Sequence, residues 1–243
     1  MAVEDLVRTS RQNRSSAVMN QRTEPLTSHD YFGTPPWATR AVVRYLGLPR
    51  SAVVYDPACG RGHMLRPLSE SFDMVMGSDI QELGFGAVRD YLKVTLDDFG
   101  GDDLPARPDW IFLNPPFRLG NDFILRSIEL AQHGVAALVR TNFAETRGRY
   151  VSLFRDNRPT YRLQFVERVV MHKGDPPDPD VPVRVWDKKR EKYVWRKPST
   201  ATSYEWMVWD KKATQGHTVA DWLAVPRREL SKEHDYIVPR RKT

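Results

Sequence analysis

The sequence has one cysteine, scattered histidines and no long apolar run. Cys59 is the only cysteine in 243 residues, which excludes an internal disulfide and a cysteine-rich zinc site. The six histidines lack the spacing of metal ligands, so we expect no bound metal. No stretch is long enough to span a membrane, and the N-terminal segment MAVEDLVRTSRQNRSS has no signal-peptide core. We therefore expect a cytoplasmic protein with no membrane partner.

The chain carries a formal net charge of +6, with arginines in the polar N-terminal segment and a group of basic residues at the C-terminal end. Residues 1–29 are polar and aperiodic, and we expect them to form a basic flexible arm. Residues 212–243 are expected to form a basic C-terminal extension. Excess positive charge favours a polyanionic partner, because each Lys or Arg near a phosphate releases a counterion. Solubility is the alternative explanation of the charge.

Short apolar runs alternate with helical segments along much of the chain, which is typical of a parallel sheet covered by helices on both faces. The expected strands are 51–56, 73–79, 91–94, 109–113 and 134–140, and the expected helices are 37–48, 63–72, 81–88 and 121–132. Segments 161–171 and 203–210 predict two more strands, paired antiparallel at one edge. We therefore predict an α/β fold with a seven-stranded, mostly parallel sheet. It lies in a domain spanning 30–211, with an inserted β-hairpin at about 174–202.

The first expected strand ends in a turn that contains two glycines, Asp56-Pro57-Ala58-Cys59-Gly60-Arg61-Gly62. Glycines let the backbone turn tightly and approach a ligand closely. Ligands of such sheets bind at the carboxyl ends of the strands. A dinucleotide-binding motif would need glycine at position 65, where this chain has Leu65. The second strand ends in Asp79, which either binds the two hydroxyls of a ribose or is an ordinary turn aspartate.

The fourth expected strand, 109–113, leads directly into Asn114-Pro115-Pro116-Phe117, the most specific pattern in the chain. Prolines lack a donor and stiffen a strand exit, so a buried strand has no structural need for them here. The side-chain oxygen of Asn114 and the carbonyl of Pro115 can both accept hydrogen bonds from one planar amino group. Phe117 can stack on the ring that carries this group. The two acceptors would draw the nitrogen toward tetrahedral geometry and free its lone pair to attack an electrophilic methyl group. A simple strand-ending turn is the alternative.

The order of these motifs resembles class I S-adenosylmethionine-dependent methyltransferases, and among them small orphan or phage-type DNA N6-adenine enzymes. Many of those carry Asp/Asn-Pro-Pro-aromatic at the fourth strand. Segment 31–35 resembles the cofactor motif before their first strand, and 98–99 the acid-aromatic pair that holds the cofactor's adenine. Segments 140–143 and 204–209 extend the resemblance over most of the chain. It implies methyl transfer from S-adenosylmethionine to the N6 amino group of adenine in double-stranded DNA, in a bacterial or phage-infected cell.

The resemblance also implies a role for each matching residue. The NPPF motif would handle the target base through Asn114, Pro115, Pro116 and Phe117. The residues implied to bind the cofactor are Tyr31 and Thr34 at its methionine end, Asp56, Ala58 and Gly60 around its amino-acid moiety, Gly62 in the glycine turn, Asp79 and Ile80 at the adenosine, and Asp98 and Phe99 at the adenine.

A base in a duplex must be flipped out before it reaches such a pocket, so a recognition surface is needed elsewhere in the chain. One candidate is the segment 142–155, with Arg147 and Arg149. The other is the hairpin, where basic and aromatic side chains alternate and a two-stranded ribbon would fit the major groove. Its candidate residues are Arg184, Trp186, Lys188, Lys189, Arg190, Lys192, Trp195 and Arg196. The alternative is a solvated edge hairpin whose tryptophans pack on the sheet.

Two other functions are compatible with the sequence. Asn-Pro-Pro-aromatic also occurs in enzymes that methylate amino groups of guanine or adenine in RNA, or of glutamine in protein, and the basic ends fit RNA as well as DNA. The second is a non-catalytic nucleic-acid-binding protein with this fold, against which the intact Asp56, Asp79 and Asn114 argue. No nuclease segment is present, so this chain alone is not expected to cut DNA. The pattern selects neither a recognition sequence nor an oligomeric state.

Overall fold

The computed structural model describes residues 31–187 and 190–236. The expected N-terminal arm, and the candidates Lys188 and Lys189, lie outside the described residues. No helix in the described ranges is long and apolar enough to cross a membrane. Those same ranges hold no group of three or more His, Cys, Asp or Glu side chains placed to bind a metal ion.

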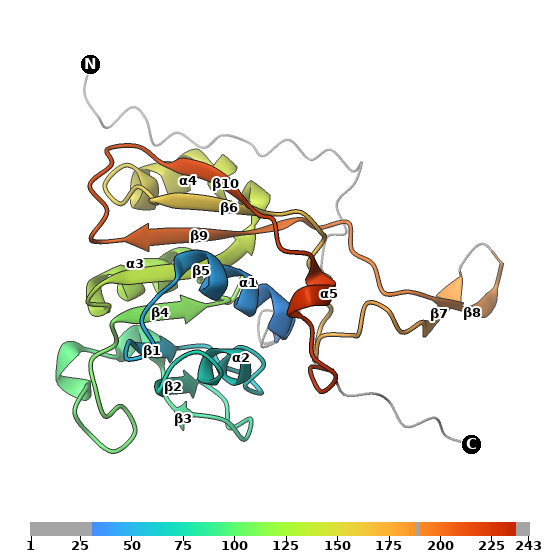
Figure 1. Ribbon diagram of the computed structural model, residues 1–243, viewed down its shortest axis with the longest axis horizontal. Coiled ribbons are helices and arrows are strands. Elements are labelled where there is room, and N and C mark those ends of the chain that lie inside the picture. Colours follow the sequence, from blue (N-terminus) through green and yellow to red (C-terminus); the bar gives the residue numbers. More distant parts are fainter. Residues whose placement is uncertain (1–30, 188–189, 237–243) are drawn as a thin grey trace.

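An eight-stranded sheet forms the centre of the molecule, in the order β10-β6-β9-β5-β4-β1-β2-β3 (Figure 1). Its strands are β1 (Val53–Asp56), β2 (Met74–Asp79), β3 (Ala87–Val88), β4 (Trp110–Leu113), β5 (Gly134–Arg140), β6 (Tyr161–Phe165), β9 (Tyr204–Asp210) and β10 (Val219–Leu223). Only β9 runs antiparallel to its neighbours, β5 and β6. The predicted α/β fold with a mostly parallel sheet is therefore confirmed, with eight strands in place of seven.

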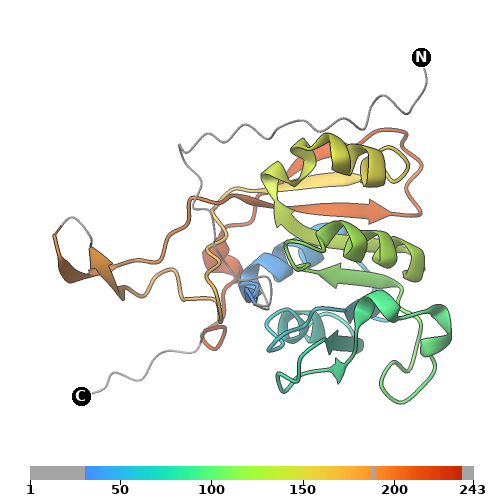
Figure 2. The same ribbon diagram turned by 180° about the vertical axis from the view of Figure 1, so that it is seen from behind.

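Helices cover both faces of this sheet, as Figures 1 and 2 show from opposite sides. The α-helices are α1 (Pro36–Leu46), α2 (Leu65–Ser69), α3 (Gly120–Leu130), α4 (Arg147–Arg149) and α5 (Arg227–Leu230). Alternate residues of one strand enter opposite cores: Phe112 packs with α1 and α2, whereas Ile111 and Leu113 pack with α3. Because successive side chains of a strand point to opposite faces, a strand buried on both sides is apolar throughout.

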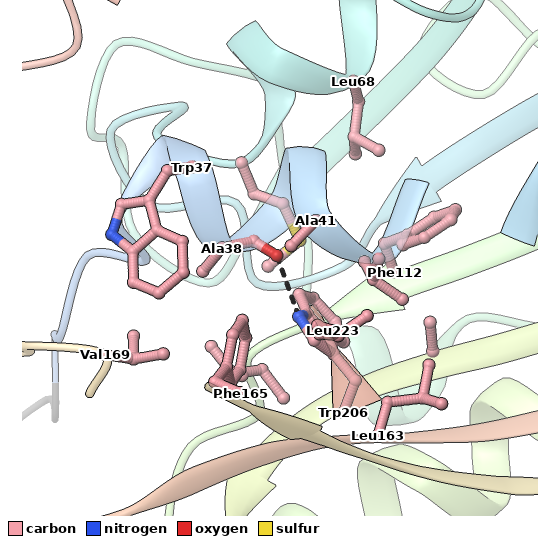
Figure 3. Packing of buried hydrophobic residues seen from close by; sticks show 14 of the residues in the cluster. Trp37, Ala38, Ala41, Leu68, Phe112, Leu163, Phe165, Val169, Trp206 and Leu223 are labelled. Carbon is pink, nitrogen blue, oxygen red and sulfur yellow. Dashed lines mark hydrogen bonds between the residues drawn. The ribbon is translucent and has the colours of Figure 1, made fainter. Parts of the chain in front are cut away.

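Trp206 of β9 fastens α1 to the middle of the sheet (Figure 3). Its side chain is fully buried, and its indole N–H donates to the backbone carbonyl of Ala38 over 2.9 Å. The buried indole therefore has both apolar surroundings and a hydrogen-bond partner. This contact holds the start of α1 beside the carboxyl ends of the strands. The segment that precedes α1, beginning at Tyr31, is thereby placed at the same edge.

The third strand differs from the sequence prediction. Residues 91–94 were expected to form it, but Tyr91–Lys93 is a short 3-10 turn, and β3 lies in the segment 81–88 that was expected to be helical. Gly86 explains the difference: its φ is +71°, and a Cβ there would lie 2.4 Å from the carbonyl oxygen of Gly77. This close backbone approach ends any helix and brings β3 alongside β2.

The sheet also continues beyond residue 211, where the expected domain ended. β10 pairs in parallel with β6, and Tyr45 of α1 donates a hydrogen bond to Asp221 on this strand. Farther along, Asp235 is buried and forms an ion pair with Arg40 of α1. The described part of the expected C-terminal extension therefore belongs to the packed domain. Sequence patterning missed β10 because only Leu223 on it is fully buried.

The predicted hairpin is present as β7 (Val183–Asp187) and β8 (Lys192–Arg196), paired antiparallel. It forms a separate two-stranded sheet that projects from the body of the molecule (Figures 1 and 2). Trp186 is 51% exposed and Trp195 is 71% exposed. The alternative in which these tryptophans pack on the central sheet is therefore wrong.

Candidate functional site

A cavity of about 400 Å³ opens at the carboxyl ends of β1, β2 and β4. It is walled by the segment before α1, the turn after β1, the end of β2, residues 89–92 and the motif after β4. From the predicted site its lining includes Tyr31, Thr34, Asp56, Ala58, Asp79, Ile80, Asn114, Pro115, Pro116 and Phe117. The topology therefore brings together most of the residues that the resemblance implied, from segments up to about a third of the chain apart.

The turn after β1 requires glycine at position 60. Gly60 has a φ of +53°, and a Cβ at this position would lie 2.4 Å from the ring of Tyr31. Its backbone N–H donates to one carboxylate oxygen of Asp79 over 2.9 Å, and the N–H of Gln81 donates to the other over 3.0 Å. Gly60 and Gly62 shape the turn behind the wall and do not themselves line the cavity. The Asp79 carboxylate is thus fixed at the cavity, with oxygen lone pairs remaining for hydroxyl donors.

Asp56 is the most deeply buried acid in the cavity wall. Its side chain is 1% exposed, and one carboxylate oxygen accepts a hydrogen bond from the N–H of Ala58 over 3.1 Å. Burial raises the pKa of Asp56 to about 8, and the negative charge of Asp79 acts in the same direction. No arginine or lysine among the described residues pairs with Asp56. A cationic ligand group in the cavity would supply the charge that this carboxylate lacks.

Tyr31 closes one side of the cavity through contacts that sequence reasoning missed. Its hydroxyl hydrogen-bonds with Nδ1 of His63 over 2.8 Å and donates to Asp175 over 3.2 Å. Asp175 also pairs with Arg61 over 3.1 Å. Burial lowers the pKa of His63, which favours the neutral imidazole. The residue before this aspartate, Gly174, exchanges backbone hydrogen bonds with Tyr31 and Gly33. Residues 174–175 therefore hold Tyr31 in the cavity wall from behind, although they do not line the cavity themselves.

The acid-aromatic pair at 98–99 does not reach the cavity. Asp98 accepts hydrogen bonds from the backbone N–H and hydroxyl of Thr95 and pairs with Arg89, so it caps its own short turn. Phe99 packs edge-on against Tyr55. The cavity is instead lined by residues 90–92, where Asp90 is followed by an aromatic residue. The structure thus places the predicted pair outside the cavity, and the same acid-aromatic pattern lies at the cavity wall eight residues earlier, closer to the end of β3.

The nitrogen end of the Asn114 side-chain amide is held by contacts within the protein. Its Nδ2 donates to the backbone carbonyl of Phe32 over 2.8 Å and contacts the sulfur of Met171 at 3.8 Å. The donor end of the amide is therefore used within the protein, and Oδ1 is the end left to accept from a ligand. Phe117, three residues later, packs against the Phe32 ring with centroids 5.1 Å apart.

A second cavity of about 360 Å³ shares Pro115 and Phe117 with the first. It lies between the start of α3, the end of β5 and the segment formed by the 3-10 helix η4 (Thr141–Glu145) and α4. Arg140 and Arg149 line it, together with the exposed Glu145. The first cavity by contrast carries Asp56, Asp79 and Asp90, beside Arg89 and Arg118. The two cavities that meet at the NPPF motif thus differ in charge.

The predicted nucleic-acid-binding residues fall into two groups. On the hairpin, the register places Arg184, Trp186, Tyr193 and Trp195 on one face of the ribbon. The guanidinium of Arg184 lies 4.3 Å from the centre of the Tyr193 ring, and Arg196 pairs with Asp187. Arg190 and Lys192 are exposed at the tip. In the other group, Arg149 lines the second cavity, whereas Arg147 is exposed outside it.

Comparison with known proteins gives structural likeness without sequence likeness. No protein-family model matches the chain. No curated protein matches its sequence. Among solved structures, one described as the modification subunit of a type I restriction enzyme from Vibrio vulnificus is similar, with a TM-score of 0.50 and 16% identity over 81% of this chain. One described as a class I S-adenosylmethionine-dependent methyltransferase from Listeria monocytogenes has a TM-score of 0.50 and 11% identity over 77%.

The chain has the class I methyltransferase fold. It spans 48% of the length of the Vibrio chain and 64% of the Listeria chain. At these identities the likeness is one of backbone arrangement, and function must be argued from the site.

Proposed function

We propose that this protein transfers a methyl group from S-adenosylmethionine to the N6 amino group of adenine in double-stranded DNA. The observation that carries the proposal is the position of Asn114. Asn114 lines the acid-bearing cavity next to Pro115, which the arginine-lined cavity shares, and its amide nitrogen is bound to Phe32, so its amide oxygen is the end left for a ligand. One cavity offers a place for the methyl donor and the other a place for an anionic substrate.

The first cavity fits the proposed cofactor. Asp79 is held by two backbone N–H groups with lone pairs left for the hydroxyls of a ribose. Asp56 is a buried carboxyl without a cationic partner among the described residues, suited to an ammonium group. Ile80 and Asp90 would lie along the adenine, and the Gly60 turn leaves room for the methionine end. When bound, S-adenosylmethionine supplies an electrophilic methyl group.

The NPPF motif supplies the chemistry that an exocyclic amine requires. The lone pair of such an amine is delocalised into its ring, which makes it a poor nucleophile. Asn114 Oδ1 and the Pro115 carbonyl accept its two N–H groups, and these bonds strengthen as the nitrogen becomes tetrahedral and positively charged. Interactions that strengthen in the transition state accelerate the reaction, whereas uniform binding does not. Phe117 would hold the ring that bears the amine.

The charge of the surface favours DNA over protein as the substrate. The site itself favours an enzyme over a protein that only binds nucleic acid. The exposed hairpin with Arg190 and Lys192, and the arginines of the second cavity, suit phosphates and poorly explain a glutamine side chain. A protein that only binds nucleic acid has no need for a buried, unpaired Asp56. RNA remains the second candidate substrate, because the same charges suit its backbone.

Transfer of tritium from labelled cofactor tests this proposal directly. Duplex DNA, RNA and protein extract are offered separately, and the product is digested to nucleosides. We expect label in N6-methyladenine from DNA. Label in guanine, in cytosine or in a protein side chain would contradict the substrate, and no heat or thermal shift with the demethylated cofactor would contradict the cofactor.

A further inference from the structure

The second cavity contains an arginine, Arg140, that forms no ion pair with a carboxylate in the described part of the chain. Arg140 is the last residue of β5, and its guanidinium lies 4.4 Å from the centre of the Phe117 ring. Its Nε is buried and has no hydrogen-bond partner. Across residues 31–187 and 190–236, no carboxylate forms an ion pair with this side chain. A guanidinium stays charged and carries five N–H donors, so leaving it unsatisfied in a partly buried place is unfavourable.

Arg149 lies in the same cavity and is held in a similar way. Its guanidinium is 4.2 Å from the centre of the Phe143 ring, and one nitrogen donates to the Phe143 carbonyl over 3.1 Å. Burial lowers the pKa of Arg149. Each arginine is thus stacked on an aromatic ring, which fixes the plane of its guanidinium while leaving N–H groups for a ligand. Two fixed guanidinium groups beside one exposed carboxylate form a site for an anion.

We propose that Arg140 and Arg149 bind the phosphate of the target nucleotide, so that the second cavity is a phosphate subsite beside the methyl-transfer site. Planar guanidinium groups bind phosphate oxygens through paired hydrogen bonds. The subsite shares Pro115 and Phe117 with the first cavity, so an anion there lies next to a base held at Asn114. The inference rests on the proposed function, because it takes that base to be part of a nucleotide. Arg140 is accordingly a positioning residue for the substrate, and the methyl transfer itself occurs at Asn114 and Pro115.

Binding of dAMP and deoxyadenosine, which differ only in the phosphate, tests this subsite. Both are titrated by calorimetry into the full chain saturated with the demethylated cofactor. We expect wild type to bind dAMP about tenfold more tightly than deoxyadenosine, the scale of a charge-assisted hydrogen bond. Arg140→Gln should abolish most of this preference, and Arg140→Lys should retain part of it. Arg44→Ala is the matched control, because it removes one exposed arginine of α1 that lines neither cavity.

Methyl-transfer kinetics then separate positioning from a structural role. With a duplex oligonucleotide, Arg140→Gln should raise the KM for DNA about tenfold, with kcat and the KM for cofactor changed little. A wild type that binds dAMP and deoxyadenosine equally, or an Arg140→Gln variant with unchanged KM for DNA, overturns the subsite. A wild type that prefers dAMP but methylates no nucleic acid supports the anion site and contradicts the proposed function instead.

Discussion

The side-chain amide of Asn114 donates to the backbone carbonyl of Phe32 over 2.8 Å. This bond joins the motif after β4 to the segment before α1, and it leaves the amide oxygen for a ligand, which we propose to be the substrate amine. Asn114→Ala should lower the methylation rate by roughly a hundredfold or more, as when one transition-state acceptor is removed. Affinity for the demethylated cofactor should change little. Rates under single-turnover conditions and calorimetry measure the two quantities.

The matched control for this variant is Asn157→Ala, because Asn157 lies outside both cavities. It should retain the wild-type rate. Full activity in Asn114→Ala would show that the two-acceptor mechanism is incorrect, whatever the substrate proves to be.

Gly60→Ala should damage the cofactor cavity. The new Cβ would meet the Tyr31 ring at 2.4 Å in a backbone conformation that L-residues rarely adopt. Gly47→Ala provides the comparison, since Gly47 has a similar φ of +57° with no atom within 4 Å of its Cβ position. Both variants should lose about 1 kcal/mol of stability from the backbone strain. Only Gly60→Ala should also lose affinity for the demethylated cofactor, by about tenfold or more, and equal affinities in the two variants would argue against this wall.

Asp90 and Asp98 can be distinguished by cofactor binding. Asp90 lines the cavity, whereas Asp98 caps the turn that begins at Thr95. Asp90→Ala should weaken binding of the demethylated cofactor by about tenfold, the scale of one hydrogen bond to a charged group. Asp98→Ala should leave the affinity unchanged. The reverse result in calorimetry would restore the pair predicted from the sequence.

Asp56 should make the stability of the free protein fall as pH rises. Its folded-state pKa is about 8, whereas an aspartate in an unfolded chain titrates near pH 4, as is usual. The folded protein therefore holds a proton that the unfolded chain has lost across this interval. The stability that this bound proton contributes is fully present below about pH 4. It is lost progressively as the pH rises to about 8, by no more than about 1.4 kcal/mol per pH unit.

Urea unfolding of wild type and Asp56→Asn at several pH values between about 5 and 8 checks this expectation. The variant cannot ionise at this position, so its free energy of unfolding should depend less steeply on pH than that of wild type. Parallel pH profiles for the two proteins would mean that Asp56 is already ionised in the folded state.

The hairpin should contribute salt-dependent affinity for DNA. Arg190 and Lys192 are exposed at its tip, and replacing both by alanine should reduce the slope of log affinity against log salt by about two units. The loss should be similar for all DNA sequences. Trp195→Ala should instead change sequence preference, because this exposed ring is suited to base contact. Fluorescence anisotropy at several salt concentrations measures these effects.

The control for the hairpin removes two positive charges elsewhere, at Arg44 and Arg158, which are both exposed. An equal fall of the salt slope in this control would show that the hairpin contributes only through the general positive charge of the protein. An unchanged slope in the hairpin variant would indicate that DNA contacts the segment 142–155 and not the hairpin.

The sequence alone determined the features that depend on local chemistry. Alternating apolar runs predict a parallel sheet because each strand buried on both faces must be apolar throughout. The glycine turn up to Gly62 and the Asn114-Pro115 strand exit were recognisable because their backbone conformations favour particular residue types. The hairpin followed from its alternating pattern and charged turn, and the structure bears out its strands.

The tertiary structure decided what depends on contacts between distant segments. Asp175 reaches Tyr31 across 144 positions of sequence, and β10 joins the sheet although its residues lack the pattern of a buried strand. Asp90 lines the cavity and Asp98 does not because of where the chain turns after Gly86. Arg140 is a candidate anion-binding residue only because it stacks on Phe117 and forms no ion pair with a carboxylate of the described chain. Such relationships leave no periodic trace in a sequence, because they are set by packing across the sheet and not by neighbours along the chain.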